Sequence, residues 1–179
     1  MIDESFYWKY DLLKNAKAIS RRLQQRRWPD AALARCEQTI MLGFYSIRKL
    51  TESAKLTDAV SNMHVAVRSY PAIGRTVHRL NCHRLETLYD FDAPQKRSVT
   101  LRYLCNQVIH SYVFSLIFAE GGSLDGILVA SDHERSKELL EVAARTVVEV
   151  FEMVGSDEVN SMAATFDDRK ADYVLRNNR

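Results

Sequence analysis

Three polar side chains recur every fourth residue in the middle of the chain, namely Arg102, Asn106 and His110. An α-helix advances about 100° per residue, so a step of four residues overshoots a full turn by only about 40°. If this stretch is helical, a guanidinium, an amide and an imidazole lie along one side of it. A buried polar group without a partner costs about 1–3 kcal/mol. The polar edge must therefore be either an internal hydrogen-bond network or the lining of a site.

The composition is typical of a soluble globular protein. The 179 residues are 46% hydrophobic and 27% charged, and a chain of this length can fold without disulfides or metal. The longest apolar stretch, 112–119, contains Ser115 and is too short to span a bilayer, so we expect no membrane association. Three widely spaced cysteines and an acidic start without a signal pattern favour a reduced, cytoplasmic protein.

Charge is divided unevenly along the chain. Residues 1–119 contain 18 Lys and Arg against 10 Asp and Glu, whereas residues 120–179 contain 7 against 13. A polyanion would bind the basic part, although packing of the basic part against the acidic part explains the division equally well. The arginines at 21, 22, 26 and 27 need no ligand, because positive charge at a helix C-terminus is favourable.

Hydrophobic periodicity predicts a mainly α fold, a helical bundle with a small β-hairpin insertion, in a single domain 1–179. A helical pair at 4–53, interrupted at Trp28-Pro29, precedes an irregular basic segment at 54–96. The remaining expected elements are a central helix at 98–111, a hairpin at 112–130, a helix at 132–154, and a C-terminal short helix and tail at 157–179.

Local signals set some of these boundaries. Ser98 is placed to cap the central helix, and Ser131 with Glu134 has the spacing of a capping box for the helix at 132–154. Within the basic segment, 64–68 could form a short strand and 76–89 could contain a helix. The short C-terminal helix is expected at 159–166.

Arginines of the basic segment are candidates for contact with nucleic-acid phosphates. They are Arg68, Arg75, Arg79, Arg84 and Arg97. His78, Cys82 and His83 have spacings that a metal could tolerate, but no fourth ligand accompanies them. We expect no metal site and no cofactor.

The polar edge of the central helix has the minimum set of groups for cleaving RNA without a metal. His110 can take or give a proton, Arg102 can hold a phosphate, and Asn106 can orient either of them. The chain has no Gly-rich phosphate loop, no His-Glu-x-x-His and no serine elbow. These absences set aside P-loop nucleotide hydrolysis and zinc proteolysis.

The run Asn106-Gln107-Val108-Ile109-His110-Ser111-Tyr112, after a helix pair, resembles the HEPN domains. These are helical proteins, many of them metal-independent endoribonucleases of toxin–antitoxin and antiviral defence systems, whose active site commonly forms across a homodimer. The resemblance implies a HEPN-like bundle, catalytic roles for His110, Arg102, Asn106 and Tyr112, and RNA, a second copy and an antitoxin or other protein as partners.

The chain departs from the family signature at one position. Cys105 occupies the place of the family's arginine, and Arg102 lies one turn earlier. Two functions therefore remain open. One is RNA binding with metal-independent cleavage, and the other is a catalytically inactive helical module that binds a protein partner or nucleic acid.

Overall fold

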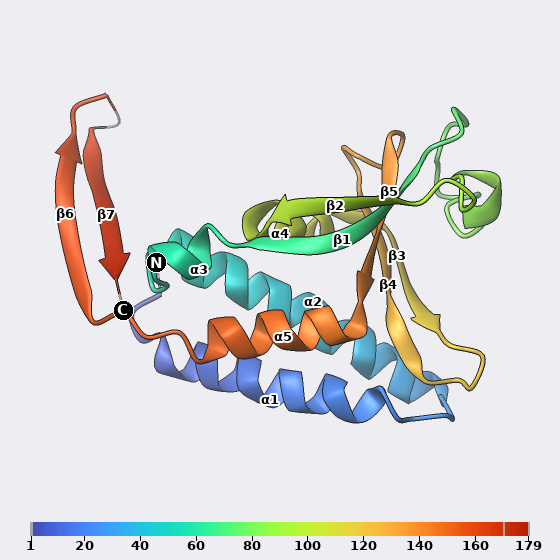
Figure 1. Ribbon diagram of the computed structural model, residues 1–179, viewed down its shortest axis with the longest axis horizontal. Helices are drawn as coiled ribbons and strands as arrows, with labels where there is room; N and C mark the ends of the chain where they lie inside the picture. Colours follow the sequence, from blue (N-terminus) through green and yellow to red (C-terminus); the bar gives the residue numbers. More distant parts are fainter. Residues whose placement is uncertain (1, 170, 179) are drawn as a thin grey trace.

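The computed structural model describes residues 2–169 and 171–178. Five strands form one antiparallel sheet in the order β2-β1-β5-β4-β3. Their bounds are β1 His64–Pro71, β2 Gln95–Thr100, β3 Ser111–Phe118, β4 Leu124–Ser131 and β5 Glu138–Ala143. Three long helices, α1 (Phe6–Arg22), α2 (Asp30–Glu52) and α5 (Ala144–Gly155), lie next to one another on one side of this sheet (Figure 1).

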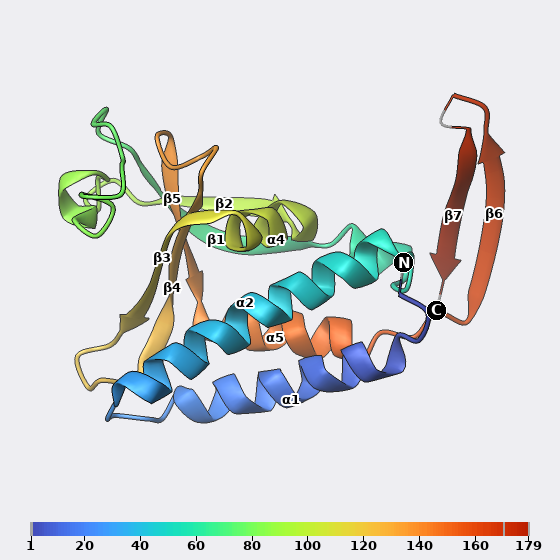
Figure 2. The same ribbon diagram turned by 180° about the vertical axis from the view of Figure 1, so that it is seen from behind.

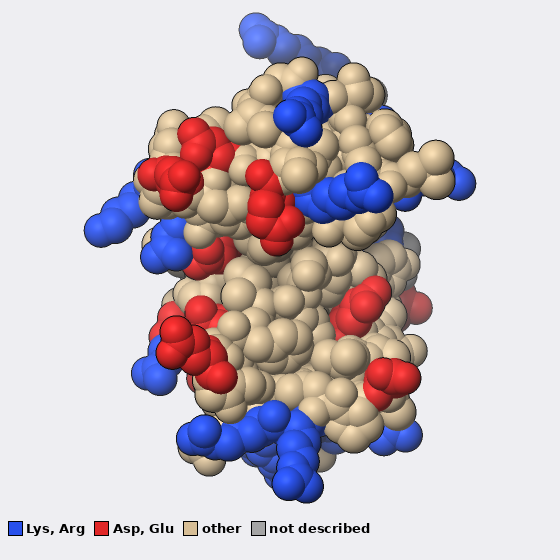
Figure 3. All heavy atoms as spheres, turned by 90° about the vertical axis from the view of Figure 1, so that its right-hand side faces the viewer, with Lys and Arg blue, Asp and Glu red and all other residues tan. Residues whose placement is uncertain are grey.

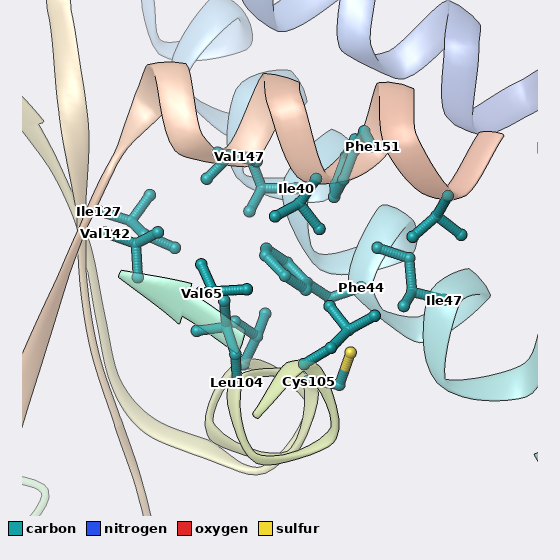
Figure 4. Close-up of a cluster of buried hydrophobic side chains, with 14 of the residues drawn as sticks. Ile40, Phe44, Ile47, Val65, Leu104, Cys105, Ile127, Val142, Val147 and Phe151 are labelled. Atoms are coloured by element: carbon teal, nitrogen blue, oxygen red, sulfur yellow. The ribbon is translucent and has the colours of Figure 1, made fainter. Parts of the chain in front are cut away.

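The main core lies between these helices and the sheet. The aromatic rings of Phe44 on α2 and Phe151 on α5 meet edge to face, with centroids 5.3 Å apart, and neither ring is exposed. Figure 4 shows them facing Val65, Ile127 and Val142 of the sheet. α4 (Leu101–Ile109) contributes further buried side chains to the same core, which fixes its orientation.

A smaller core covers the other face of the sheet. Tyr70 and Leu139 lie on that face, and the connection between β1 and β2 folds over them with Val77, Leu88 and Tyr89. This connection contains turns and one short 3-10 helix, η1 (Leu85–Thr87). Burial raises the pKa of Tyr89 to about 12, and its hydroxyl donates to the carbonyl of Arg135 at 2.7 Å.

The C-terminal strands β6 (Ser161–Asp167) and β7 (Asp172–Asn178) form a separate two-stranded hairpin, which Figure 2 shows standing away from the rest of the molecule. Its base is held by the Asn177 side chain, which donates to the carbonyls of Ala54 and Leu56 next to α3 (Asp58–Ser61). Nearly all other hairpin residues are exposed.

The expected mainly α, HEPN-like bundle with a small hairpin is wrong. The segments expected as a small insertion are β3 and β4, which belong to a five-stranded sheet that also includes β1, β2 and β5. The molecule is a mixed α and β structure in which the helices pack on a sheet rather than on one another alone.

Three expected helices also differ from the structure. The 132–154 segment is a turn, then β5, then α5, because β5 is central in the sheet and buries a leucine on each face. Ser131 does accept a hydrogen bond from the Glu134 amide, at 3.3 Å, but it closes this turn. The segments 159–166 and 76–89 contain β6 and a turn-rich loop.

The central helix is shorter than the expected 98–111. Ser98 lies in β2, opposite Ala66, and Thr100 caps the helix by accepting a hydrogen bond from the Tyr103 amide at 3.2 Å. The strand expected at 64–68 is the first part of β1.

Candidate functional site

The polar edge of α4 is open to solvent. The helix buries Leu104, Cys105 and Val108 in the main core, which turns its other side outward. Arg102 and His110 are exposed, and Asn106 is half-buried. The polar groups on this edge are therefore not sealed inside the protein.

A pocket of about 450 Å³ lies between α4 and the turn that joins β4 to β5. Its lining residues are Tyr103, Asn106, Gln107, His110, Ser131, Asp132, His133 and Glu134. We call it the histidine pocket, because it brings together two imidazoles that are far apart in the sequence.

Two hydrogen bonds fix the turn against the helix. The Gln107 side-chain oxygen accepts from the Ser131 amide at 3.0 Å, and the carbonyl of His110 accepts from the Asp132 amide at 3.0 Å. Gln107 and Ser131 are both buried. The wall that carries His133 is therefore anchored to the helix that ends at His110.

His133 has a carboxylate partner. Its Nδ1 lies 2.7 Å from Oε1 of Glu134, and Lys137 Nζ is 3.2 Å from the same oxygen. Burial would raise the pKa of Glu134, but hydrogen bonds from His133 and Lys137 outweigh it and lower the pKa. An ionised Glu134 can only accept, so Nδ1 is the donor in this contact and Nε2 is the acceptor of the neutral His133 ring.

Asn106 has an arginine partner that the sequence did not indicate. Nη1 of Arg48 on α2 donates to Oδ1 of Asn106 at 2.6 Å, while Nε of Arg48 pairs with Glu52 at 2.7 Å. Arg102, by contrast, does not line the pocket, and its side chain forms no hydrogen bond or ion pair with any residue in 2–169 or 171–178. Nothing in the local pattern around Arg48 singles it out, because its contact depends on how α2 crosses α4.

Tyr112 also lies outside the pocket lining. The guanidinium carbon of Arg135 is 3.7 Å from the centroid of its ring, a cation–π contact. Tyr112 therefore holds Arg135 of the β4–β5 turn, next to the pocket rather than in it. The four expected catalytic residues separate into two that line the pocket, Asn106 and His110, and two that do not.

A second polar cluster, the Glu138 network, adjoins the pocket. Glu138 on β5 accepts hydrogen bonds from Ser69 at 2.6 Å and from Tyr103 at 3.1 Å, and it pairs with Arg97. Burial would raise the pKa of Glu138, but the bonds from Arg97, Ser69 and Tyr103 outweigh it and lower the pKa. Burial and the charge of Glu138 raise the pKa of Tyr103 to about 12.

The arginines expected to bind nucleic acid fall into two groups. Arg68 pairs with Glu141 at 2.8 Å and Arg97 pairs with Glu138, both across the sheet. Arg75, Arg79 and Arg84 are exposed on the β1–β2 connection, and the described part of the chain offers them no ion pair. The second group keeps its charge available for a ligand.

The cysteines and other metal-ligating side chains are dispersed. In 2–169 and 171–178, no three His, Cys, Asp or Glu residues are grouped closely enough to hold a metal ion. Cys36 and Cys105 are buried, and burial raises the pKa of Cys105 to about 12. Cys105 is therefore a protonated core thiol rather than a nucleophile.

Comparison with known proteins identifies no relative: no family model matches, and neither the curated proteins nor the solved structures contain a match. Across the described residues, no helix combines the length and the apolar character needed to cross a bilayer.

Proposed function

We propose that the protein binds RNA and cleaves it by proton transfer between His110 and His133, without a metal ion. The observation that carries the proposal is that both imidazoles line one solvent-accessible pocket from different walls. Imidazole is the side chain best suited to exchange protons near neutral pH, and an acid and a base are what this reaction requires.

The proposed reaction is an attack of the ribose 2′-oxygen on the adjacent phosphate. Nε2 of His133 takes the proton of a ribose 2′-hydroxyl, and O2′ attacks the adjacent phosphorus. The bond from phosphorus to O5′ breaks, and His110 gives its proton to the departing O5′. The products are a 2′,3′-cyclic phosphate and a free 5′-hydroxyl, and nothing is oxidised or reduced.

Neighbouring groups would position the RNA. The Asn106 amide, oriented by Arg48, can donate to a phosphate oxygen inside the pocket. Arg102 lies further along the same edge of α4 and would contact a phosphate outside the pocket. This assignment keeps the expected role of Arg102 but separates it from the reacting atoms.

The experiment uses a labelled single-stranded RNA in EDTA. We expect cleavage by the parent protein to give 2′,3′-cyclic phosphate ends, and His110→Ala or His133→Ala to slow it at least about 100-fold. His64→Ala is the matched control, because His64 is exposed on β1 and lies outside the pocket lining. Equal turnover by the parent and both pocket variants, or cleavage of a 2′-deoxy oligonucleotide, would contradict the proposal.

We further propose that the protein acts in the cytoplasm as a homodimer joined through the β6–β7 hairpin. One face of the hairpin is apolar and exposed, formed by Met162, Ala164, Phe166, Tyr173 and Leu175. A lone two-stranded hairpin is marginally stable in water, and a second copy brings an identical face to cover it. The free, mostly buried cysteines are compatible with a reducing compartment.

Sedimentation tests this assembly. We expect a dimer for the parent protein and a monomer for Phe166→Ser with Tyr173→Ser, since both rings lie on the apolar face. Thr165→Ser with Val174→Ser alters the opposite face and should leave the dimer intact. A parent protein that sediments as a monomer would rule the assembly out.

A further inference from the structure

A dense group of arginines lies where α1 is joined to α2. Arg21 and Arg22 are in the last turn of α1, Arg26 and Arg27 follow it, and Arg35 is in the second turn of α2. Four of these five side chains are exposed, and Arg22 is half-buried. Figure 3 shows Lys and Arg side chains gathered at the lower end of the molecule, where Figure 1 places this connection. We call the five residues the arginine corner.

Within the described residues, the arginines of the corner form no ion pair. Ion pairs elsewhere in the described structure join acids to Arg48, Arg68 and Arg97. The helix dipole accounts for positive charge in the last turn of α1 only. It does not account for Arg26 and Arg27 beyond that turn, nor for Arg35 within the next helix.

The corner is held rigidly against the β3–β4 turn. The Trp28 indole donates to the carbonyl of Gly122 at 2.7 Å, and a Cβ at Gly122 would lie 2.8 Å from the backbone oxygen of Arg26. Gly122 also has a φ of +80°, where other residues are strained. The arginines are therefore presented on a fixed scaffold and not on a loose tail.

An exposed aromatic ring adjoins the charges. Phe118 at the end of β3 is 38% exposed, and its ring centroid lies 4.9 Å from that of Trp28. The Arg22 guanidinium lies on the Trp28 ring at 5.6 Å. Guanidinium groups without an ion pair, beside an accessible ring, are the features by which proteins hold single-stranded nucleic acid, through phosphate contacts and base stacking.

From this arrangement we infer that the arginine corner binds the phosphodiester backbone of a single-stranded nucleic acid, with a base stacked on Phe118. The charged residues are all arginine, whose planar fork fits phosphate oxygens two at a time. The inference goes beyond the proposed cleavage, because the corner residues are absent from the lining of the histidine pocket.

The test measures binding of a fluorescent twelve-residue oligothymidylate, which lacks the 2′-hydroxyl and cannot undergo the proposed cleavage. With about five phosphate contacts at a slope of about 0.7 each, affinity should fall about 100-fold between 50 and 200 mM salt. Arg26→Gln with Arg27→Gln should bind more weakly at 50 mM salt and lose only about 20-fold over the same range.

Matched variants separate site binding from bulk charge. Lys14→Gln with Lys17→Gln removes the same charge from exposed positions of α1 outside the corner and should keep the parent salt dependence. Phe118→Leu should weaken binding about tenfold if a base stacks there. Melting temperatures close to that of the parent show that each variant is folded.

Three results would overturn the inference: no binding by the parent protein, equal losses in the arginine and lysine pairs, or binding to phosphatidylserine vesicles without binding to the oligonucleotide. The last would indicate a membrane surface instead. Binding of the oligothymidylate with no cleavage of RNA would leave this inference standing and remove the proposed cleavage, so the two fail separately.

Discussion

The Glu138 network and the histidine pocket share Tyr103 but differ in how their polar groups are satisfied. Tyr103 donates to Glu138 and also lines the pocket. In the network, three donors from different elements converge on one carboxylate that is only 13% exposed. In the pocket, His110 is exposed and the His133 side chain is 82% exposed.

The difference separates polar residues that are engaged within the fold from polar residues that remain open to a ligand. The Glu138 carboxylate already accepts from Arg97, Ser69 and Tyr103 and has little capacity left to bind a ligand. Its role is to join β1, β2, α4 and β5. The contacts of imidazoles that face solvent contribute little to the stability of the fold. Their ring nitrogens therefore remain available for chemistry. Mutations should therefore reduce stability in one cluster and activity in the other.

The largest expected effect on stability comes from Glu138→Ala. It leaves the Ser69 hydroxyl and the Tyr103 phenol without their acceptor and Arg97 without its counter-charge. Because Arg97 is 41% exposed, water replaces part of that contact, and the expected loss is about 1–3 kcal/mol of unfolding free energy. Urea denaturation at neutral pH measures it.

His110→Ala is the matching variant in the pocket. It should change the unfolding free energy by no more than about 0.5 kcal/mol, as for other exposed positions. A loss equal to that of Glu138→Ala would show that His110 is a structural residue and would erase the distinction between the clusters.

The sequence predicts those parts of the fold whose signals are local. Trp28-Pro29 separates α1 from α2, and the glycines near 121 mark the turn between β3 and β4. The helix expected at 132–154 is wrong around Leu139 because this segment is a central strand that is buried on both faces. Leu140 packs in the main core and Leu139 in the smaller one. Such a strand has no alternation to distinguish it from a helix that continues into α5.

The sequence could bring together only those pocket residues that lie close to one another along one helix. Asn106 and His110 line one pocket because His110 caps the end of α4, one turn after Asn106. His133 and Arg48 join them through the β4–β5 turn and the crossing of α2, and contacts over such sequence distances leave no mark in spacing. Arg102 has the helical spacing that places it on the same edge of α4, yet it does not line the pocket.

Acid should weaken the Glu138 network. The pKa of Glu138 is lowered from its ordinary value of 4.5 by its three donors. Its stabilising contribution is therefore complete above about pH 4.5 and is lost as the pH falls through the lowered pKa of the folded state. Glu138→Gln should be less stable than the parent by about 1 kcal/mol at pH 7, and the two urea midpoints should converge below pH 4.5.

Glu120→Gln is the control for acid, because Glu120 is an exposed carboxylate in the β3–β4 turn. Its urea midpoint should follow that of the parent at every pH. If the Glu138→Gln difference stayed constant down to pH 3, the carboxylate would not be held ionised by its donors.

The smallest contribution expected of any of these contacts comes from the pair of Arg48 and Asn106. A double-mutant cycle of Arg48→Gln with Asn106→Ala should give a coupling of about 0.5–1 kcal/mol in unfolding free energy, because Arg48 donates to Asn106 at 2.6 Å. The same cycle with Arg102→Gln should give none, since Arg102 has no such contact. Coupling of Asn106 to Arg102 instead would show that the Arg102 guanidinium reaches the pocket, as the four-residue spacing alone implies. There would then be no reason to propose that Arg102 contacts RNA outside the pocket.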